Sequence, residues 1–172
     1  MDTPTLQEAN HDNIDALYHM HTEMDADEHG FTNPAFGMSR KAFDGYIDTL
    51  IYQSKGLDLR PGLVPQTTFW LMRGDYPLGL SRLRHYLNDN LRKAGGNIGF
   101  YIRPSERGKG YGNLILSLAL IQAARMSLDR VLLTCDSDNA GSKRVIENNG
   151  GVLEREDIRM QFCYYWIDLV TP

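Results

Sequence analysis

The chain has 172 residues, of which 42% are hydrophobic and 23% are charged, and its formal net charge is −4 at pH 7. This balance is typical of one globular domain that buries a core, and it disfavours a disordered chain or a coiled coil. The slightly negative charge disfavours a nucleic-acid binder, which usually carries a basic stripe. The most apolar stretch, residues 114–126, is too short to span a bilayer. We therefore expect a single domain over residues 1–172 that has neither nucleic acid nor membrane as a partner.

The first residues, MDTPTLQEANHDN, contain neither a basic segment nor an apolar one, so the sequence predicts no secretory signal. Two cysteines, Cys135 and Cys163, are too few for the dense disulfide framework of small secreted domains. A cytoplasmic protein is the expectation that follows.

The first part of the chain predicts one short strand and two helices. Residues 5–8 are expected to form the strand. Asp12 or Asn13 can cap a helix over about 13–27, in which apolar positions recur at helical spacing. Ser39 can cap a second helix, whose apolar residues fall on one face. The segments NPAFGM and 55–65 contain glycine and proline and are expected to be loops.

Strands dominate the rest of the chain. The segments QTTFWLMR and PLGLSRLRHYL flank the turn RGDYP and predict an antiparallel hairpin, and the polar residues 88–97 predict a loop or a short helical turn. The remaining elements are expected in this order: the strand NIGFYIRP, the glycine-rich SERGKGYG, the helix LILSLALIQAARMSL, the strand RVLLTCD, a helix over 139–149, and the strands GVLERE and MQFCYYWIDLV. This order predicts an α/β (α+β) fold with a mostly antiparallel central sheet and helices on its faces.

The segment RGKGYG, residues 107–112, lies between a predicted strand and a long predicted helix. Glycines permit turns that a Cβ opposes, and they let backbone N–H groups approach a ligand closely. A helix N-terminus adds unpaired N–H donors and a partial positive charge, so the segment predicts an anion site suited to phosphate. The spacing fits neither the Walker A loop nor the dinucleotide fingerprint. A tight turn that binds no ligand is the alternative at this point.

The same segment resembles the [Q/R]-x-x-G-x-[G/A] loop of the GNAT superfamily of N-acetyltransferases. The strand before it, FYIRPSE, is similar to the family's apolar strand, which runs into a proline just ahead of the loop. Thirty residues later, LLTCDSDNAGSKRVIENNGG resembles the family's next strand and helix, with Asn139, Ser142 and the pair Gly150-Gly151 at the family's positions. The resemblance covers about residues 98–151.

The resemblance implies a fold and a ligand. The fold would be a GNAT-like mixed, mostly antiparallel sheet of about seven strands flanked by about four helices, in which a splayed strand pair binds CoA. The ligand would be acetyl-CoA, as a cosubstrate, and no metal is expected. The residues that the resemblance assigns to CoA are Phe100, Tyr101 and Ile102 beside the pantetheine and thioester, Arg107, Gly108, Lys109, Gly110, Tyr111 and Gly112 at the pyrophosphate, and Asn139 and Ser142 near the pantetheine.

Acyl transfer to an amine needs a deprotonated amine near the thioester, a donor for the developing oxyanion and, in some enzymes, an acid for the departing thiolate. By resemblance, the attack is direct within a ternary complex, and the oxyanion donor is the backbone N–H of Ile102. Many family members carry a tyrosine acid seven residues after the asparagine, and here that position is Ile146. Four other hydroxyls are open as the acid: Ser142, Tyr111, Tyr164 and Tyr165. A thiolate can also leave without a dedicated acid.

The general base is open as well. Asp136 follows a buried strand beside the expected site and His85 lies on another strand, and each could accept a proton or serve as an ordinary structural residue. Cys135 lies in the apolar run VLLTC, where an inert buried thiol is the expectation. The segment HMHTEMDADEH predicts a solvated acidic helix end and no metal site, because His19 and His21 do not share a helix face.

The sequence therefore predicts an enzyme that transfers an acetyl group from acetyl-CoA to an amine of a small molecule or a peptide. Two other function classes are open: a non-catalytic acyl-CoA binding or sensing module, and a binder of another phosphate ligand such as a nucleotide. A homodimer formed through an edge strand or the C-terminal hairpin is compatible with each. The acceptor would enter over the N-terminal helices and the C-terminal strands, where the motifs carry no information.

Overall fold

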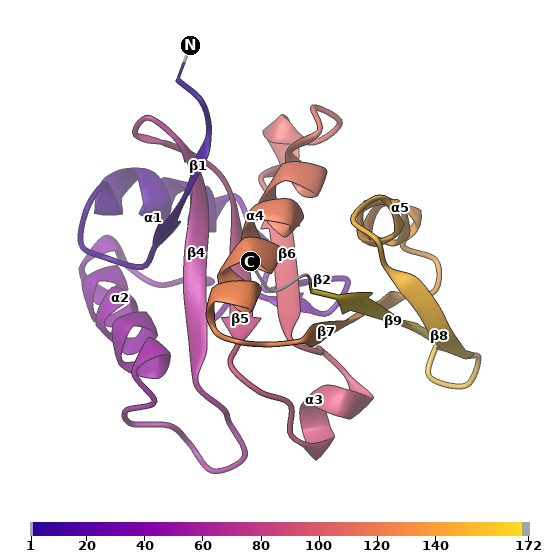
Figure 1. Cartoon of the computed structure of the whole chain (residues 1–172). Helices are drawn as coiled ribbons and strands as arrows, with labels where there is room; N and C mark the ends of the chain where they lie inside the picture. The colour runs from indigo at the N-terminus through magenta and orange to yellow at the C-terminus, as the bar shows by residue number, and fades with distance from the viewer. Residues whose placement is uncertain (1, 170–172) are drawn as a thin grey trace.

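The computed structural model describes residues 2–169 (Figure 1), so Val170, at the end of the predicted last strand, lies outside the described residues. The elements are β1 (Thr5–Glu8), α1 (Ile14–Thr22), β2 (Asp27–Glu28), β3 (Phe31–Thr32), α2 (Arg40–Ser54), β4 (Gln66–Arg73), β5 (Tyr76–Arg84), α3 (Asp89–Lys93), β6 (Ile98–Ile102), a 3-10 turn (Pro104–Glu106), α4 (Tyr111–Arg125), β7 (Arg130–Asp136), α5 (Ala140–Asn148), β8 (Val152–Asp157) and β9 (Phe162–Asp168). The predicted α+β class is confirmed.

The seven main strands form two antiparallel sheets, where the sequence predicted one sheet. The first sheet has the order β1-β4-β5-β6 and the second has the order β7-β9-β8. The strands β2 and β3 form a separate hairpin that the sequence did not predict. The division between the two sheets falls between β6 and β7, and it creates the cleft described below.

Helix α1 ends at Thr22, before the predicted end near residue 27, and a side chain from a later loop bonds to carbonyls at and just beyond this end. Asn33 Nδ2 donates to the carbonyl oxygens of His21 and Met24 at 3.0 and 3.3 Å. The acidic segment that follows α1 turns at His29 and Gly30, whose φ values are 50° and 77°. Two consecutive positive φ values are the geometry of a tight hairpin turn, and the β2–β3 hairpin results.

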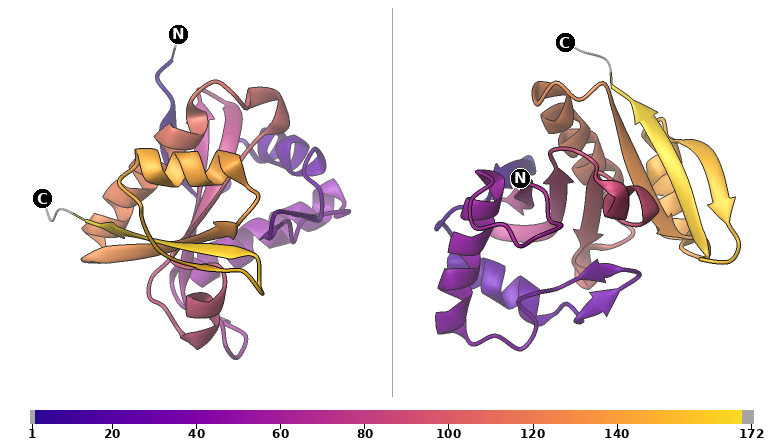
Figure 2. Two further views of the ribbon diagram at one scale, coloured as in Figure 1. Left: turned by 90° about the vertical axis from the view of Figure 1, so that its right-hand side faces the viewer. Right: turned by 90° about the horizontal axis from the view of Figure 1, so that it is seen from below.

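Helices α1 and α2 cover one face of the first sheet, and α4 covers the other (Figures 1 and 2). Alternate residues of β5 divide between these faces. Leu80 packs in one apolar cluster with Phe43 of α2, whereas Leu83 packs in another with Leu116 of α4. Both clusters are buried, so β5 and β6 are held from two sides.

The two sheets meet at Asn97, directly before β6. The N–H of Asn97 donates to the carbonyl of Leu132 at 2.6 Å, and its Oδ1 accepts from the N–H of Leu132 at 2.8 Å. Gly96 permits this approach, since a Cβ at that position would lie 2.2 Å from the Leu132 oxygen. Beyond this contact no ladder joins β6 to β7 within residues 2–169, and the two strands diverge (Figure 2). Strands β6 and β7 therefore form a V-shaped cleft that is closed at Asn97, and this point is called the closed end of the V below.

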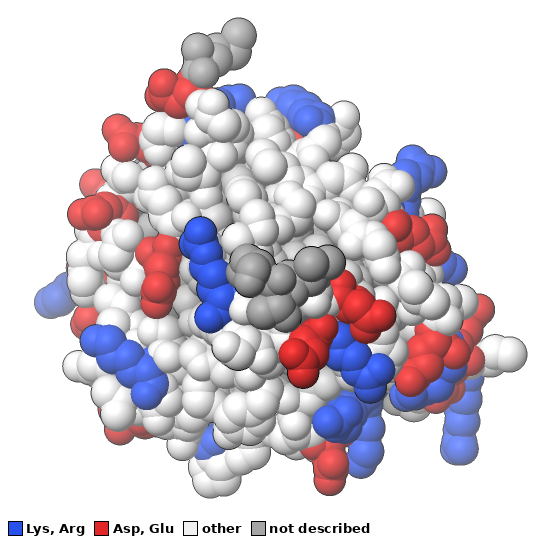
Figure 3. Space-filling view, in the orientation of Figure 1, with Lys and Arg blue, Asp and Glu red and all other residues white. Residues whose placement is uncertain are grey.

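Within residues 2–169, no helix combines the length and the apolar character that crossing a bilayer requires. On the face shown in Figure 3, acidic and basic side chains are interspersed, without a stripe of one sign. Strand β8 lies at the edge of the second sheet, and nearly all of its residues are exposed. Self-association through this edge stays a prediction.

Buried His21 should make the stability of the protein depend on pH. Its ring lies between α1 and α2, with ring centroids 5.2 Å from Phe43 and 5.7 Å from Tyr46. Burial lowers the pKa of His21 from 6.5 to about 4, although a hydrogen bond with Asn33 acts in the opposite direction. Between pH 6.5 and 4 the unfolded chain binds a proton that native His21 does not. The free energy of unfolding should therefore fall by on the order of 3 kcal/mol as the pH decreases through this window.

Urea unfolding at several pH values, on the wild type and on His21→Gln, measures this contribution. Carboxylates titrate in both proteins, so the difference between the two slopes of unfolding free energy against pH isolates the contribution of His21. We expect the shallower slope for the variant. Equal slopes would contradict the assignment of a neutral buried His21.

Candidate functional site

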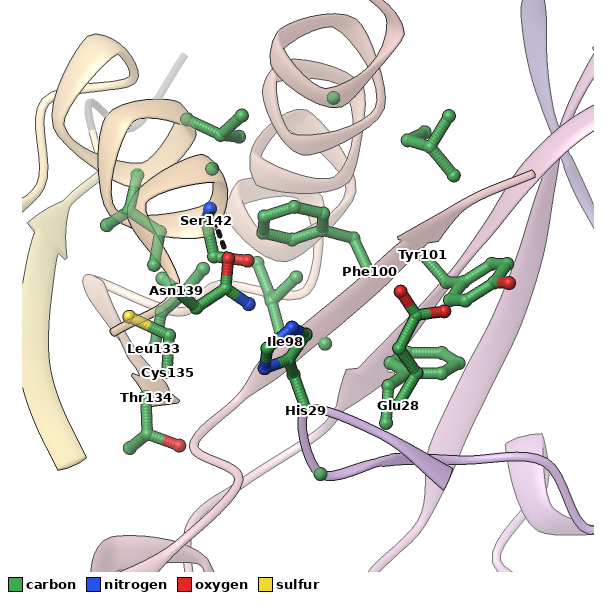
Figure 4. Close-up of a pocket in the computed structure, with 18 of the residues that line it drawn as sticks. Glu28, His29, Ile98, Phe100, Tyr101, Leu133, Thr134, Cys135, Asn139 and Ser142 are labelled. Atoms are coloured by element: carbon green, nitrogen blue, oxygen red, sulfur yellow. Dashed lines mark hydrogen bonds between the residues drawn. The ribbon is translucent and has the colours of Figure 1, made fainter. Parts of the chain in front are cut away.

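The divergence of β6 and β7 opens a cavity of about 670 Å³. Its walls come from both strands, the N-terminal ends of α4 and α5, and the β2–β3 hairpin (Figure 4). Of the residues that the resemblance assigned to CoA, all except Lys109 line it: Phe100, Tyr101, Ile102, Arg107, Gly108, Gly110, Tyr111, Gly112, Asn139 and Ser142. A cavity of this size is typical of a small-molecule site.

One edge of β6 turns free backbone groups toward the cavity. The N–H of Arg84 donates to the carbonyl of Asn97 at 2.8 Å, and the N–H of Arg103 donates to the carbonyl of Leu78 at 3.0 Å. In an antiparallel ladder hydrogen-bonded pairs alternate with pairs that are not bonded, so the N–H groups of residues 98, 100 and 102 point away from β5. No strand of the described chain pairs with that edge. The N–H of Ile102 is therefore available to a ligand.

A second run of free N–H groups lies at residues 108–113. Gly108 and Gly110 have φ values of 75° and 85°, and Gly110 is the N-cap of α4 without any side-chain cap. Throughout the part of the chain that the structure describes, the N–H groups of residues 108–113 have no hydrogen-bond acceptor. Successive free N–H groups at a helix N-terminus form a concavity that binds anions. The cavity reaches this loop at Gly108, Gly110 and Gly112.

Carboxylates engage both cations of the loop. Arg107 forms a two-point ion pair with Glu28 at 2.8 and 2.9 Å, and its Nε donates to the carbonyl of Ile102 at 3.0 Å. This hydrogen-bonded pair holds the pKa of Glu28 below its usual value. Lys109 Nζ donates to Glu106 at 3.0 Å and lies outside the cavity lining. From sequence we expected both cations beside a phosphate, whereas in the structure Arg107 fastens the β2–β3 hairpin to the end of β6.

The N-terminus of α5 contributes Asn139 and Ser142. The Oδ1 of Asn139 accepts from the N–H of Ser142 at 3.0 Å, as the dashed line in Figure 4 shows. This bond caps α5 and leaves the Asn139 amide N–H groups for a ligand. The Ser142 hydroxyl makes no hydrogen bond within residues 2–169, and Ile146 lines the same wall.

The three tyrosine hydroxyls that were open as an acid are all engaged. Tyr111 accepts from Arg73 Nη1 at 2.9 Å and lines the cavity. Tyr164 donates to the carbonyl of Lys93 at 2.7 Å, and Tyr165 donates to Glu147 at 3.0 Å. Neither Tyr164 nor Tyr165 lines the cavity. Of the four hydroxyls, only that of Ser142 combines a place in the cavity lining with freedom from a partner in the described chain.

A histidine–carboxylate pair lies on the side of the cavity formed by the hairpin. His29 Nδ1 lies 3.0 Å from Asp136 Oδ2, at the end of β7. Figure 4 places the His29 ring between Asn139 and Glu28. A carboxylate at Nδ1 favours the tautomer with a proton on Nδ1 and a lone pair on Nε2. Asp138 is also near, with one ligand atom within 4.8 Å of those of the pair.

His85 is not brought to the cavity. Its Nε2 lies 2.9 Å from Thr67 Oγ1, on the neighbouring strand β4. Burial lowers the pKa of His85. Of the two bases considered from sequence, neither lines the cavity, and only Asp136 contacts a lining residue, His29.

Sequence reasoning missed His29, Glu28 and Asn97. Each acts through a partner far along the chain, at separations of 107, 79 and 35 residues. The only local signal was Gly30 directly after His29, which marks a turn within the acidic run. No periodicity predicts which strand end that turn reaches.

Cys135 lines the cavity and faces Cys163 across the β7–β9 ladder, and both thiols are free. Burial raises the pKa of the Cys135 thiol to about 12. The thiol is therefore protonated at neutral pH, which disfavours a nucleophilic role.

A protein-family model described as an acetyltransferase (GNAT) domain matches residues 5–152 of the sequence. Among solved structures, RimL, a ribosomal L7/L12 alpha-N-protein acetyltransferase in complex with coenzyme A, has a TM-score of 0.71 at 16% identity, covering 99% of this chain and 96% of its own. YncA from Salmonella typhimurium, a putative acetyltransferase with acetyl-CoA, has a TM-score of 0.67 at 12% identity, with coverages of 98% and 95%.

A third similar structure is the spermidine N-acetyltransferase from Vibrio cholerae in complex with CoA and spermine, with a TM-score of 0.64 at 14% identity and coverages of 96% and 95%. At these identities the likeness shows a shared fold. No curated protein matches the sequence significantly.

Proposed function

The chain belongs to the GNAT acetyltransferase family, and from this premise we propose that it transfers an acetyl group from acetyl-CoA to an amine of a small molecule or a peptide. The observation that supports this most strongly is the presence of two sets of free backbone N–H groups in one cavity, on β6 and on residues 108–113. The first set suits an extended pantetheine arm, and the second suits a pyrophosphate.

Ile102 is the proposed donor to the oxyanion. Its N–H points out of the β5–β6 ladder toward the cleft, so it needs no rearrangement to bind the developing charge. The Ile102 carbonyl is occupied by Arg107 Nε at 3.0 Å, which fixes the orientation of this peptide unit. Replacement of the side chain would leave this donor in place.

His29 is the proposed general base. Its Nε2 would take the proton of the attacking amine, while Asp136 on Nδ1 stabilises the imidazolium that forms. The amine must lose a proton because an ammonium has no lone pair. This assignment replaces direct deprotonation by Asp136 with deprotonation through the imidazole.

Ser142 is the proposed donor to the departing thiolate. It lies on the cavity wall beside Ile146, the position where many family members carry a tyrosine. The Ser142 hydroxyl is the only one of the four considered that lines the cavity without a partner in residues 2–169. We expect a modest contribution, because a thiolate is a fair leaving group.

Turnover tests the proposal. Purified protein is mixed with acetyl-CoA and a panel of amines that includes simple amines, amino acids, short peptides and spermidine. Amine-dependent release of the CoA thiol, together with an acetylated product in the mass spectrum, is the expected result. The isoleucine at position 146 favours one other candidate, a non-catalytic acyl-CoA binding module. Binding of CoA without turnover of any amine would support that module and contradict the enzyme.

Gly110→Val should weaken CoA binding about 10- to 100-fold. A Cβ at Gly110 would meet nothing within 4 Å, so the added side chain would extend into the open space at the loop. A β-branched residue also resists the φ of 85°. Losing one hydrogen bond to a charged phosphate costs about 1.5 to 3 kcal/mol. Isothermal titration calorimetry with CoA measures the change.

Gly37→Val is the matched control. Gly37 has a φ of 73° and likewise meets nothing within 4 Å, but it does not line the cavity. The two variants should lose similar stability, and only Gly110→Val should lose CoA affinity. Unchanged affinity in folded Gly110→Val would contradict the placement of the pyrophosphate.

A further inference from the structure

Two arginines on β5, Arg82 and Arg84, line the cavity. They lie two residues apart on a strand and therefore share one face of the sheet. Arg82 is only 5% exposed. Burial and the charge of Arg82 lower the pKa of Arg84 to about 10, which leaves the Arg84 guanidinium charged at neutral pH. Arg84 is partly exposed, and two like charges this close together are costly unless an anion compensates them.

Neither arginine has such a compensating partner in residues 2–169. Arg82 Nη2 donates to the carbonyl of Thr32 at 2.8 Å, and its guanidinium lies 4.5 Å from the Phe31 ring centroid. Arg84 Nη1 donates to the carbonyl of Gly95 at 3.1 Å. Across the described chain, Nε and the other terminal nitrogen of each have no acceptor, and neither arginine forms an ion pair. Most of their donors therefore have no acceptor from the protein and are open to a ligand or to solvent.

The carboxylates around the cavity are committed elsewhere. Glu28 is bound by Arg107 and Glu106 by Lys109, while Asp136 lies against His29. Tyr46 and His21 lie near Arg82 and add no negative charge, because burial raises the pKa of Tyr46 and lowers that of His21. The cationic pair therefore has no protein anion to neutralise it.

The position of the pair separates it from the proposed phosphate site. Arg82 is opposite Gly99 in the β5–β6 register and shares a sheet face with Leu80, which packs against α1 and α2. From Gly99 to Ile102 the strand rises by roughly 10 Å, and the loop of residues 108–113 lies beyond that end. The arginines therefore lie near the closed end of the V.

Gly99 leaves space beside the arginines. A Cβ there would lie 3.4 Å from Phe31 Cε2 and 3.7 Å from Arg84 Nη1. Glycine keeps this part of the cavity wall free of a side chain. Gly99 and Arg84 both line the cavity, with the Phe31 ring beside them, so the Arg84 guanidinium borders the cavity space.

We propose that the acceptor amine carries a carboxylate, which Arg82 and Arg84 bind, so that the substrates are amino acids and related amino carboxylates. This inference rests on the proposed acetyl transfer and names the acceptor class for the same site. A guanidinium presents its N–H donors in a fork that matches a carboxylate. The same pair repels the additional ammonium groups of a polyamine. The acceptor class therefore differs from that named for the spermidine N-acetyltransferase of similar fold.

The first test compares several amino acids with their own carboxamides. We expect kcat/KM to be at least tenfold higher for the amino acids. The carboxamides have the more readily deprotonated α-amino group, so chemistry alone would favour them. Carboxamides used as well as the acids, or spermidine used better than either, would overturn the proposal.

Arg82→Gln and Arg84→Gln should each raise KM for the amino acid about tenfold and leave KM for the carboxamide nearly unchanged. Both should retain the CoA-induced rise in the unfolding midpoint. Arg60→Gln is the matched control, because this substitution removes the same charge from an exposed residue that lies outside the cavity lining. Loss of CoA binding in both arginine variants would place the pair at the CoA phosphates and overturn the proposal.

A binding measurement does not depend on turnover. Protein saturated with CoA is titrated with N-acetyl amino acids and with their carboxamides. Selective binding of the carboxylates supports the proposal, and equal binding or none contradicts it. Failure of acetyl transfer itself would look different: no amine, with or without a carboxylate, would be acetylated, whether or not CoA raises the unfolding midpoint.

Discussion

Replacing His29 with glutamine should lower kcat about 100- to 1,000-fold and leave CoA affinity within about twofold. General base catalysis contributes about 10² to 10⁴ to enzyme rates. Glutamine retains a polar group of similar reach but cannot take the proton from the amine. His29 reaches the cavity from the tip of the β2–β3 hairpin, and its position is set by Asp136 at 3.0 Å and by the hairpin turn. Steady-state kinetics with a productive amine measures the effect.

The control for this variant is a second exposed histidine–aspartate pair, His11 and Asp48, whose Nε2–Oδ1 distance is also 3.0 Å and which does not line the cavity. His11→Gln should leave kcat unchanged. Raising the pH should partly restore His29→Gln, because more of the amine is then deprotonated in solution. A His29→Gln enzyme with wild-type kcat at neutral pH would contradict the assignment of the base.

Gly96→Ala should destabilise the protein by about 3 kcal/mol or more, which lowers the unfolding midpoint by roughly 10 °C. A Cβ at Gly96 would lie 2.2 Å from the oxygen and 2.8 Å from the carbon of the Leu132 carbonyl, and the φ of 60° disfavours any side chain. Because these are backbone atoms, relief requires the two sheets to move apart at Asn97. The closed end of the V should therefore loosen, and CoA affinity should fall as well.

Gly95→Ala separates the steric overlap from the positive φ. Gly95 has a φ of 101°, but its nearest contact would be Leu91 Cδ2 at 3.5 Å, an ordinary distance. Thermal and urea unfolding of both variants measure the difference. Equal losses of stability in the two variants would show that the contact with Leu132 does not hold the sheets together.

Local signals in the sequence were sufficient for most elements. Ser39 begins α2 as predicted, with its Oγ accepting from the N–H of Ala42 at 3.2 Å, and Asn139 caps α5 in the same way. The glycines at 108 and 110 have the positive φ values that a phosphate-type loop requires. Each of these features depends on residues close together in the chain, so sequence spacing describes them well.

Features that depend on distant residues were not predicted. The two sheets separate at Asn97, whose side chain donates to the carbonyl of Arg84 and accepts from the N–H of Leu132. No pattern of apolar residues predicts these contacts. Arg82 and Arg84 lie in a segment that the sequence predicts only as one strand of a hairpin. Within residues 2–169 neither arginine forms an ion pair with a carboxylate, and only the three-dimensional arrangement shows this.

Thermal unfolding with and without acetyl-CoA, CoA and ATP tests most directly whether the cleft between β6 and β7 binds the cosubstrate. A ligand that binds the native state raises the midpoint by mass action. The geometry predicts a clear rise with acetyl-CoA and with CoA, no rise with ATP, and a reduced rise for Gly110→Val. An unchanged midpoint with both CoA species would contradict the account, since the free N–H groups of β6 and of residues 108–113 would then serve no CoA.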